Sequence, residues 1–116
     1  KGKEEFSGIS PVVKSACRYI RNHYDSPELG LAEIAEECGI STGYLSMVFK
    51  KEMKVTARQF IEEYRIEAAK ERLAHTNERV QDISEACGFT QHGYFSRVFK
   101  QKTGMTPAEY REKFYE

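Results

Sequence analysis

The feature that most constrains this sequence is an internal repeat with a spacing of about 50 residues. Similar residues recur in the same order in two copies, and the offset grows from 49 to 50 because the second copy has one added residue near its turn. Each copy has a short amphipathic segment, a glycine and a second segment with an aromatic and aliphatic face, the pattern of a helix-turn-helix. The paired positions are Ile34, Cys38, Gly39 and Ser41 with Ile83, Cys87, Gly88 and Thr90, then Gly43, Tyr44, Ser46, Val48, Phe49, Lys50 and Thr56 with Gly93, Tyr94, Ser96, Val98, Phe99, Lys100 and Thr106.

Apolar residues recur at helical spacing along most of the chain, and no strand-like alternation of useful length interrupts them. Ser10-Pro11, Ser41 and Thr90 are typical helix starts, and Thr56 and Thr106 each open a capping box. The helix from Ala57 to about Leu73 is apolar on more than one side, as expected for a helix packed between two units. The sequence therefore predicts an all-α fold with seven helices forming two helix-turn-helix subdomains joined by a long central helix. We expect a linker end at 1–9, subdomains at 10–55 and 76–116, and the connecting helix at 56–75.

Composition limits the functions open to this chain. Its 116 residues suffice for a modest core but not for a deep active-site cleft. The longest apolar run has three residues, so no membrane span or signal peptide is expected. Three cysteines without a CxxC pair favour a reducing, intracellular and hence cytoplasmic setting. The chain begins at Lys1 without a methionine, which suggests a fragment of a longer protein.

The charge balance is neutral, with 18 basic and 18 acidic residues, which argues mildly against a nucleic-acid partner. The basic residues nevertheless gather in two stretches, 41–58 and 89–102, that fall at matching places in the repeat. Such clustering can produce a basic face on a neutral molecule. The acidic run from Glu62 to Glu71 is interpreted as a solvated helix face, or alternatively as a contact for a basic partner such as RNA polymerase.

The second copy, from Cys87-Gly88-Phe89 through Tyr94-Phe95-Ser96-Arg97-Val98-Phe99-Lys100 to Thr106-Pro107-Ala108-Glu109-Tyr110-Arg111, closely resembles the signature of the AraC/XylS family of bacterial transcription regulators. The first copy resembles that family's first motif, and the resemblance extends over about 11–114. It implies a seven-helix DNA-binding domain of a transcription factor that binds double-stranded promoter DNA. The implied partners are RNA polymerase and an upstream sensor or receiver module, with no membrane contact. No cofactor, metal or catalytic residue is expected.

The second helix of each copy is the expected recognition helix, which would present residues at i, i+3, i+4 and i+7 to a major groove. Two such helices on one chain predict a non-palindromic site of two adjacent major-groove segments. The first helix has Gly43 and Met47 where many relatives have a large polar residue and an arginine, so we expect it mainly to position the domain. Arg97 is the strongest base-reading candidate, as a bidentate donor to guanine. The base-reading candidates are Ser46, Met47, Gln91, His92, Tyr94, Ser96 and Arg97, and the phosphate candidates are Thr42, Lys50, Lys51, Lys100 and Lys102.

Other interpretations remain open at this stage. Neutral net charge permits a helical protein-interaction module, and an enzyme is disfavoured because no phosphate loop, HExxH helix or GxSxG elbow is present. Tyr44 and Tyr94 can pack at a helix start or contact DNA. Cys38 and Cys87 are expected at equivalent buried positions, and His23 and His75 at the surface. The apolar inner residues Leu45, Val48, Phe49, Phe95, Val98 and Phe99 are expected in the core.

Overall fold

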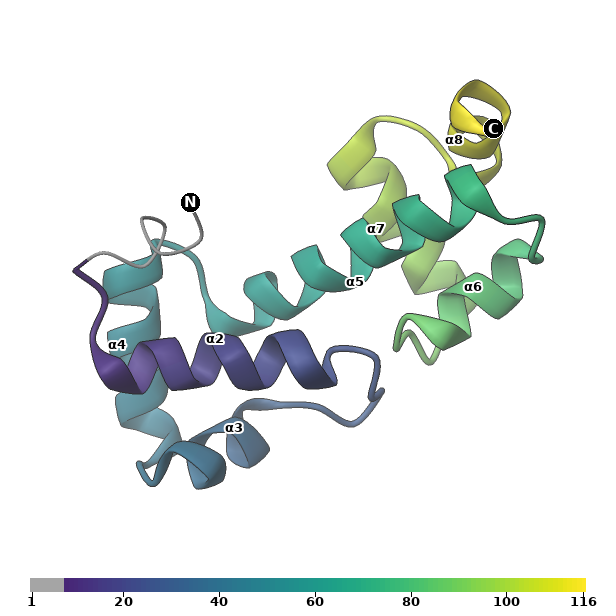
Figure 1. The fold of residues 1–116 in the computed structure, drawn as a ribbon. Helices are drawn as coiled ribbons and strands as arrows, with labels where there is room; N and C mark the ends of the chain where they lie inside the picture. The colour runs from purple at the N-terminus through teal and green to yellow at the C-terminus, as the bar shows by residue number, and fades with distance from the viewer. Residues whose placement is uncertain (1–7) are drawn as a thin grey trace. The chain divides into compact units, whose positions relative to one another are not determined.

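The computed structural model describes residues 8–116 and confirms the expected all-α fold (Figure 1). Seven helices form within this range, as the sequence predicts. The linker end expected at 1–9 falls largely on residues 1–7, which lie outside the described part of the chain. The helices are α2 (Pro11–His23), α3 (Leu31–Cys38), α4 (Thr42–Met53), α5 (Ala57–His75), α6 (Val80–Ala86), α7 (His92–Thr103) and α8 (Pro107–Phe114).

The chain divides into two compact units, each containing one copy of the repeat. The first unit contains the described residues up to His23 together with Leu29–Glu62. The second contains Tyr24–Glu28 and Glu63–Glu116. Helix α5 therefore contributes its first residues to one unit and the remainder to the other, which explains why its apolar residues occupy more than one side.

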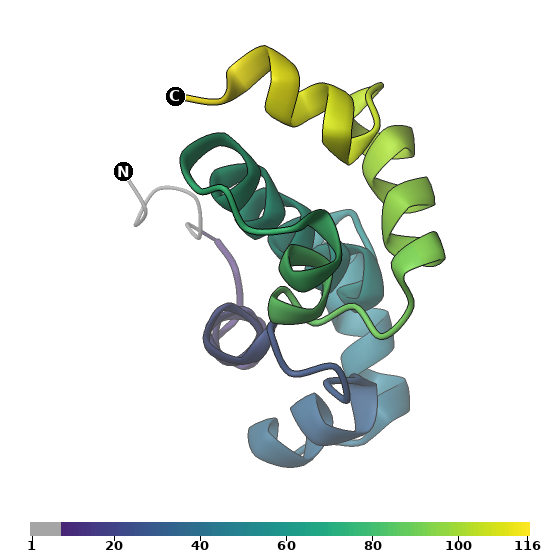
Figure 2. The ribbon, with the colours of Figure 1, turned by 90° about the vertical axis from the view of Figure 1, so that its right-hand side faces the viewer.

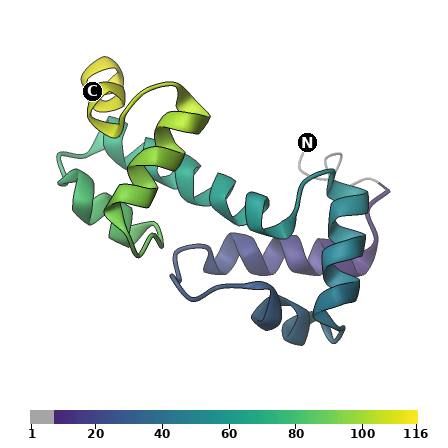
Figure 3. The same cartoon turned by 180° about the vertical axis from the view of Figure 1, so that it is seen from behind.

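In the first unit, α2 packs on both α3 and α4, and Figure 3 shows α4 running across the N-terminal end of α2. Val13, Ala16 and Ile20 of α2 are fully buried, at the spacing of one helix face. Burying a side chain of this kind stabilises the fold by about 1.5–3 kcal/mol. Ser10 fixes the start of α2, because its backbone N–H and hydroxyl both donate to Glu52 of α4, at 2.9 and 3.0 Å.

The second unit has a core that contains a row of three phenylalanine rings, and this cluster is called the second core. Phe89, Phe95 and Phe99 pack in sequence, with ring centroids 5.0 and 5.6 Å apart. Figure 2 shows α8 lying at the end of α7, and there Tyr110 of α8 meets Phe99 edge-on at 5.4 Å. Leu73 of α5 closes the same cluster. Edge-on pairs add about 0.5–1.5 kcal/mol beyond the area that they bury.

Gly88, the turn glycine of the second copy, occupies a crowded left-handed position with φ of 100°. A Cβ added there would lie 2.6 Å from the carbonyl oxygen of Tyr24 and 2.8 Å from Nε of Arg65. That Nε donates to the Tyr24 carbonyl, and a second guanidinium nitrogen donates to the carbonyl of Ser26, at 2.7 and 2.8 Å. The glycine therefore leaves room for Arg65 to hold segment 24–28 on the second unit.

Arg111 of α8 caps the C-terminus of α5. Its guanidinium donates to the carbonyls of Leu73 and Thr76, at 3.1 and 2.9 Å. The last carbonyls of a helix have no partner within the helix, and a cation placed there also complements the helix dipole. This contact attaches α8 to the C-terminal end of α5.

Helix α5 has 19 residues and ends at His75, which is the limit expected for the connecting helix and two residues past Leu73, the approximate end of its apolar pattern. The structure corrects three details of the sequence prediction. Thr90 does not begin α7, since the N-cap is Gln91 and supplies no side-chain cap. Cys38 is only half-buried, although Cys87 is buried as expected. His23 is half-buried because its ring stacks on Tyr19, with centroids 3.9 Å apart.

Three predicted helix starts and the expected core are confirmed. The Ser41 hydroxyl accepts a hydrogen bond from the backbone N–H of Tyr44. Thr56 and Thr106 both form their capping boxes, each with reciprocal hydrogen bonds to the residue three positions later. The six inner residues of α4 and α7 are all buried, namely Leu45, Val48, Phe49, Phe95, Val98 and Phe99.

Candidate nucleic-acid interface

Helix α4 separates a buried face from an exposed one. Its inner face packs into the first core, and this fixes the helix so that the opposite face lies in solvent. Met47 on that face is 59% exposed, a large value for an apolar side chain. Tyr44 at the helix start is 47% exposed, which leaves its ring available for contact. The outward residues at recognition-helix spacing are Gly43, Ser46, Met47 and Lys50, and all four are exposed.

Helix α7 presents the equivalent face in the second copy. Gly93, Arg97 and Lys100 are exposed, whereas Ser96 is half-buried. Gln91 and His92 at the helix start are exposed as well. The base-reading candidates Gln91, His92 and Arg97 are therefore accessible, and the candidate Ser96 is less so.

Tyr94 differs from its counterpart in the first copy. It is half-buried, and its ring packs against the second core, with its centroid 6.4 Å from that of Phe89. The guanidinium carbon of Arg97 lies 5.6 Å from the centre of the Tyr94 ring. A cation over an aromatic face within about 6 Å is attracted by the ring. Sequence reasoning named both residues but missed this contact, although their i, i+3 spacing on a helix was a usable signal.

The charge on the two exposed faces is strongly basic. Helix α7 contains no acidic residue, and α4 contains only Glu52, whose carboxylate accepts the two hydrogen bonds from Ser10. Lysines gather in the last turns of both helices, with Lys50 and Lys51 in α4 and Lys100 and Lys102 in α7. A neutral chain therefore carries local positive charge on both expected recognition helices. The phosphate candidates Thr42, Lys50, Lys51, Lys100 and Lys102 are all exposed.

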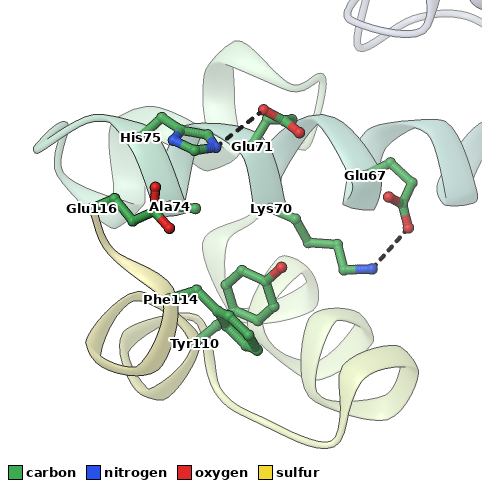
Figure 4. A pocket seen from close by; sticks show the side chains of 8 residues that line it. All are labelled: Glu67, Lys70, Glu71, Ala74, His75, Tyr110, Phe114 and Glu116. Carbon is green, nitrogen blue, oxygen red and sulfur yellow. Dashed lines mark hydrogen bonds and ion pairs between the residues drawn. The ribbon is translucent and has the colours of Figure 1, made fainter.

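Helix α5 carries a row of acidic residues. Glu63, Glu67 and Glu71 are exposed and follow one another at four-residue spacing. Glu67 pairs with Lys70 at 2.8 Å, and Glu71 lies 3.6 Å from His75. Figure 4 shows these pairs beside a hollow of about 250 Å³, whose opposite side is formed by the aromatic rings of Tyr110 and Phe114. The hollow has charged pairs at its rim but no converging set of catalytic groups.

The cysteines carry no sign of reactivity. Burial raises the pKa of both Cys17 and Cys87 to about 11 and also raises that of Cys38. A protonated thiol is a poor nucleophile and a poor metal ligand. Within residues 8–116, no group of three or more His, Cys, Asp or Glu side chains is placed to hold a metal ion. None of the seven helices of this range has the length and apolar character needed to cross a bilayer.

Two helix-turn-helix units, each with an exposed basic second helix, define a tandem helix-turn-helix DNA-binding domain. Comparison with known proteins supports this class, since a family model described as "Helix-turn-helix domain" matches residues 34–113. The arabinose operon regulatory protein of Escherichia coli strain K12 is 33% identical over 99 residues, which cover 85% of this chain. They cover only 34% of that regulator, so the chain spans about a third of the length of such a curated relative.

Solved structures agree with the sequence comparisons. The C-terminal domain of AraT, a response regulator from Geobacillus stearothermophilus, superposes with a TM-score of 0.90 at 32% identity, covering 94% of this chain and 90% of that one. The DNA-binding domain of AdpA, solved with a target DNA, shares the fold with a TM-score of 0.83 at 18% identity, covering 90% and 94%. The chain belongs to the AraC/XylS family, as a DNA-binding domain with two helix-turn-helix motifs. This is a family of transcription regulators and not of enzymes.

Proposed function

We propose that this domain binds double-stranded promoter DNA by placing α4 and α7 in two adjacent major-groove segments. The observation that carries the proposal is that both helices bury one face in a core and expose the opposite face with basic residues and without free acidic ones. A helix fits the major groove of B-DNA, where each base pair has a distinct pattern of donors and acceptors. Two reading helices on one chain remove the need for a symmetric site, so the target is expected to be non-palindromic.

Different side chains serve different parts of this task. Arg97 is proposed to read a guanine through O6 and N7, the contact for which a guanidinium is best shaped. Gln91 and His92 extend from the same helix start and suit base edges or phosphates. Met47 on α4 offers a methyl contact for thymine. The exposed set of Thr42, Lys50, Lys51, Lys100 and Lys102 is proposed to bind phosphates. Ser46 and Ser96 have short side chains and are proposed to make phosphate or water-mediated contacts.

The first recognition helix is proposed to contribute mainly position, and the second mainly sequence preference. Their faces support this division, because α4 offers Met47 at the place where α7 offers Arg97. Phosphate contacts fix the register of a protein on the duplex, whereas contacts to base edges carry the specificity. We also propose the subdomain limits 10–55 and 76–116, with 56–75 as the connecting helix.

The larger protein is proposed to contain a sensor or receiver module and to act with RNA polymerase. The relatives support the first part, since the matched regulators are much longer than this chain and one similar structure is the C-terminal domain of a response regulator. The exposed glutamates of α5 offer an acidic surface for a basic partner. An intracellular, cytoplasmic location accompanies this proposal.

The test separates base reading from phosphate binding. Sites are selected in vitro from random duplexes with the wild-type domain, and affinities are then measured over a range of salt concentrations. Arg97→Ala is expected to lose preference at one base pair, at a cost of about 1–3 kcal/mol. Lys100→Ala is expected to weaken all duplexes about equally and to reduce the log–log salt slope by ~1. Lys113→Ala on α8 is the charge-matched control and should change neither quantity.

Two outcomes would contradict the assignments. If Arg97→Ala leaves every base preference unchanged, α7 does not read sequence through this side chain. If the wild-type domain selects and binds no duplex at any salt concentration, a helical protein-interaction module is the better description. The neutral net charge of the chain would then be explained by a protein partner.

A further inference from the structure

We propose that Tyr94 is a positioning residue, which holds the Arg97 guanidinium in the place from which it reads its base. This inference rests on the proposed function of Arg97. It gives Tyr94 a role different from the direct base contact expected from the sequence. The geometry that supports it is the guanidinium carbon 5.6 Å from the ring centre, on the exposed side of α7.

The Tyr94 ring is suited to this role because it is itself held in place. The ring is half-buried and packs against the second core, with Phe89 as a neighbour. Residues three apart on a helix are surface neighbours, so the ring and the guanidinium can stay in contact without distortion of α7. An arginine on a rigid ring has fewer conformations than one in free solvent.

Restricting the arginine before DNA arrives raises the preference for its base. A flexible side chain loses rotamer entropy when it is fixed at an interface. A side chain that is already restricted in the free protein loses less entropy on binding. A cation over an exposed ring shifts the equilibrium by about two- to fivefold. We therefore expect the ring to contribute about two- to fivefold to the discrimination at the Arg97 base pair.

The repeat provides an internal control, because the first copy has the same tyrosine without the arginine. Tyr44 on α4 corresponds to Tyr94, but the residue three positions later is Met47. Tyr44 is also more exposed, at 47%, and its ring has no guanidinium at the Arg97 position to hold. Removing the Tyr44 ring should leave the discrimination at the Arg97 base pair unchanged.

The experiment uses the whole 116-residue chain and the duplex found by selection. Affinity is measured for that duplex and for one changed only at the base pair whose preference Arg97→Ala removes. Tyr94→Leu is expected to lower the affinity ratio two- to fivefold, whereas Tyr94→Phe, which keeps the ring, and Tyr44→Leu should retain it. Thermal unfolding followed by circular dichroism shows whether each variant is folded at the assay temperature.

The same variants are then made in an Arg97→Ala background, where Tyr94→Leu should leave the affinity for the selected duplex unchanged. The inference is overturned if Tyr94→Leu leaves the ratio unchanged in the wild-type background, or if it weakens binding of the selected duplex equally without Arg97, which would indicate a direct DNA contact by the tyrosine. Wild-type protein without DNA gives a second measurement, since the Hδ protons of Arg97 should be shifted upfield by the ring. Unshifted protons would also refute the contact. If Arg97→Ala changes no base preference, the base-reading assignment fails first, and that result is distinguishable from a failure of Tyr94 alone.

Discussion

The most informative stability prediction concerns Ser84 of α6, the only buried polar side chain atom without a hydrogen-bond partner among the described residues. Ser84 is 1% exposed, so its hydroxyl is shielded from water. The corresponding position in the first copy is Ala35, which is 2% exposed and has no polar side-chain group. The repeat therefore suggests the replacement to make, Ser84→Ala.

The expected gain can be worked out from the burial of the hydroxyl. Keeping a hydroxyl away from water without a partner costs about 1–3 kcal/mol, and alanine favours a helix over serine by up to ~0.5 kcal/mol. The small void left by the oxygen offsets part of this gain. Ser84→Ala should thus raise the free energy of unfolding by about 1–2 kcal/mol. In a domain of this size the midpoint of thermal unfolding should rise by at least ~4 °C.

The assay is urea and thermal unfolding followed by circular dichroism, with Ala35→Ser as the reciprocal control. Ala35→Ser adds a hydroxyl to the matching buried site and should destabilise the domain by a similar amount. Ser84 lies on α6 and outside the candidate interface, so DNA affinity should not change. An unchanged or lower unfolding midpoint for Ser84→Ala would refute the reasoning, because it would mean that the hydroxyl donates to a carbonyl of the preceding helical turn.

Three further predictions use the same unfolding assays. Gly88→Ala should cost at least ~1 kcal/mol more than Gly39→Ala, because both have left-handed backbones but only Gly88 has atoms where a Cβ would stand; equal losses would contradict this. Lys54→Gly should stabilise the domain by ~0.5–1 kcal/mol, since Lys54 has φ of 69° at the end of α4, where the second copy has glycine; a lower midpoint would count against it. Burial raises the pKa of Cys17 and Cys87 to about 11, so stability should be full below about pH 8.5 and fall as the pH approaches 11. Replacing both by alanine should flatten that fall, and an unchanged pH slope would show that other groups cause it.

Much of the fold was predictable because the two copies constrain each other. Local signals placed Ser41 and both capping boxes correctly, since an N-cap depends on residues within one turn. The predicted start of α7 at Thr90 was wrong. Thr90 has a hydroxyl as Ser41 does, but the residue added in the second copy moves the N-cap to Gln91. The contact of Arg111 with the C-terminal end of α5 joins residues far apart in the sequence, so no local signal predicts it.

The candidate site was predictable in its exposure but not in its contacts. Helical spacing separates the inner from the outer residues of α4 and α7, so the exposed face followed from the pattern. The pattern did not predict that matched positions differ in burial, although Cys38 is half-buried and Cys87 is buried. Nor did the packing of Tyr94 on Phe89, because it depends on where the second core ends. The roles of individual side chains toward DNA stay predictions.

The measurement that tests the central claim most directly is methylation interference on the selected duplex, because methylation at guanine N7 blocks major-groove contacts. Two tracts of interference, centred about 10 base pairs apart and lying in adjacent major-groove segments, are expected for binding by both α4 and α7. Arg97→Ala should remove interference at one guanine within one tract and leave the other tract intact. A single tract, or interference confined to the minor groove, would contradict the account.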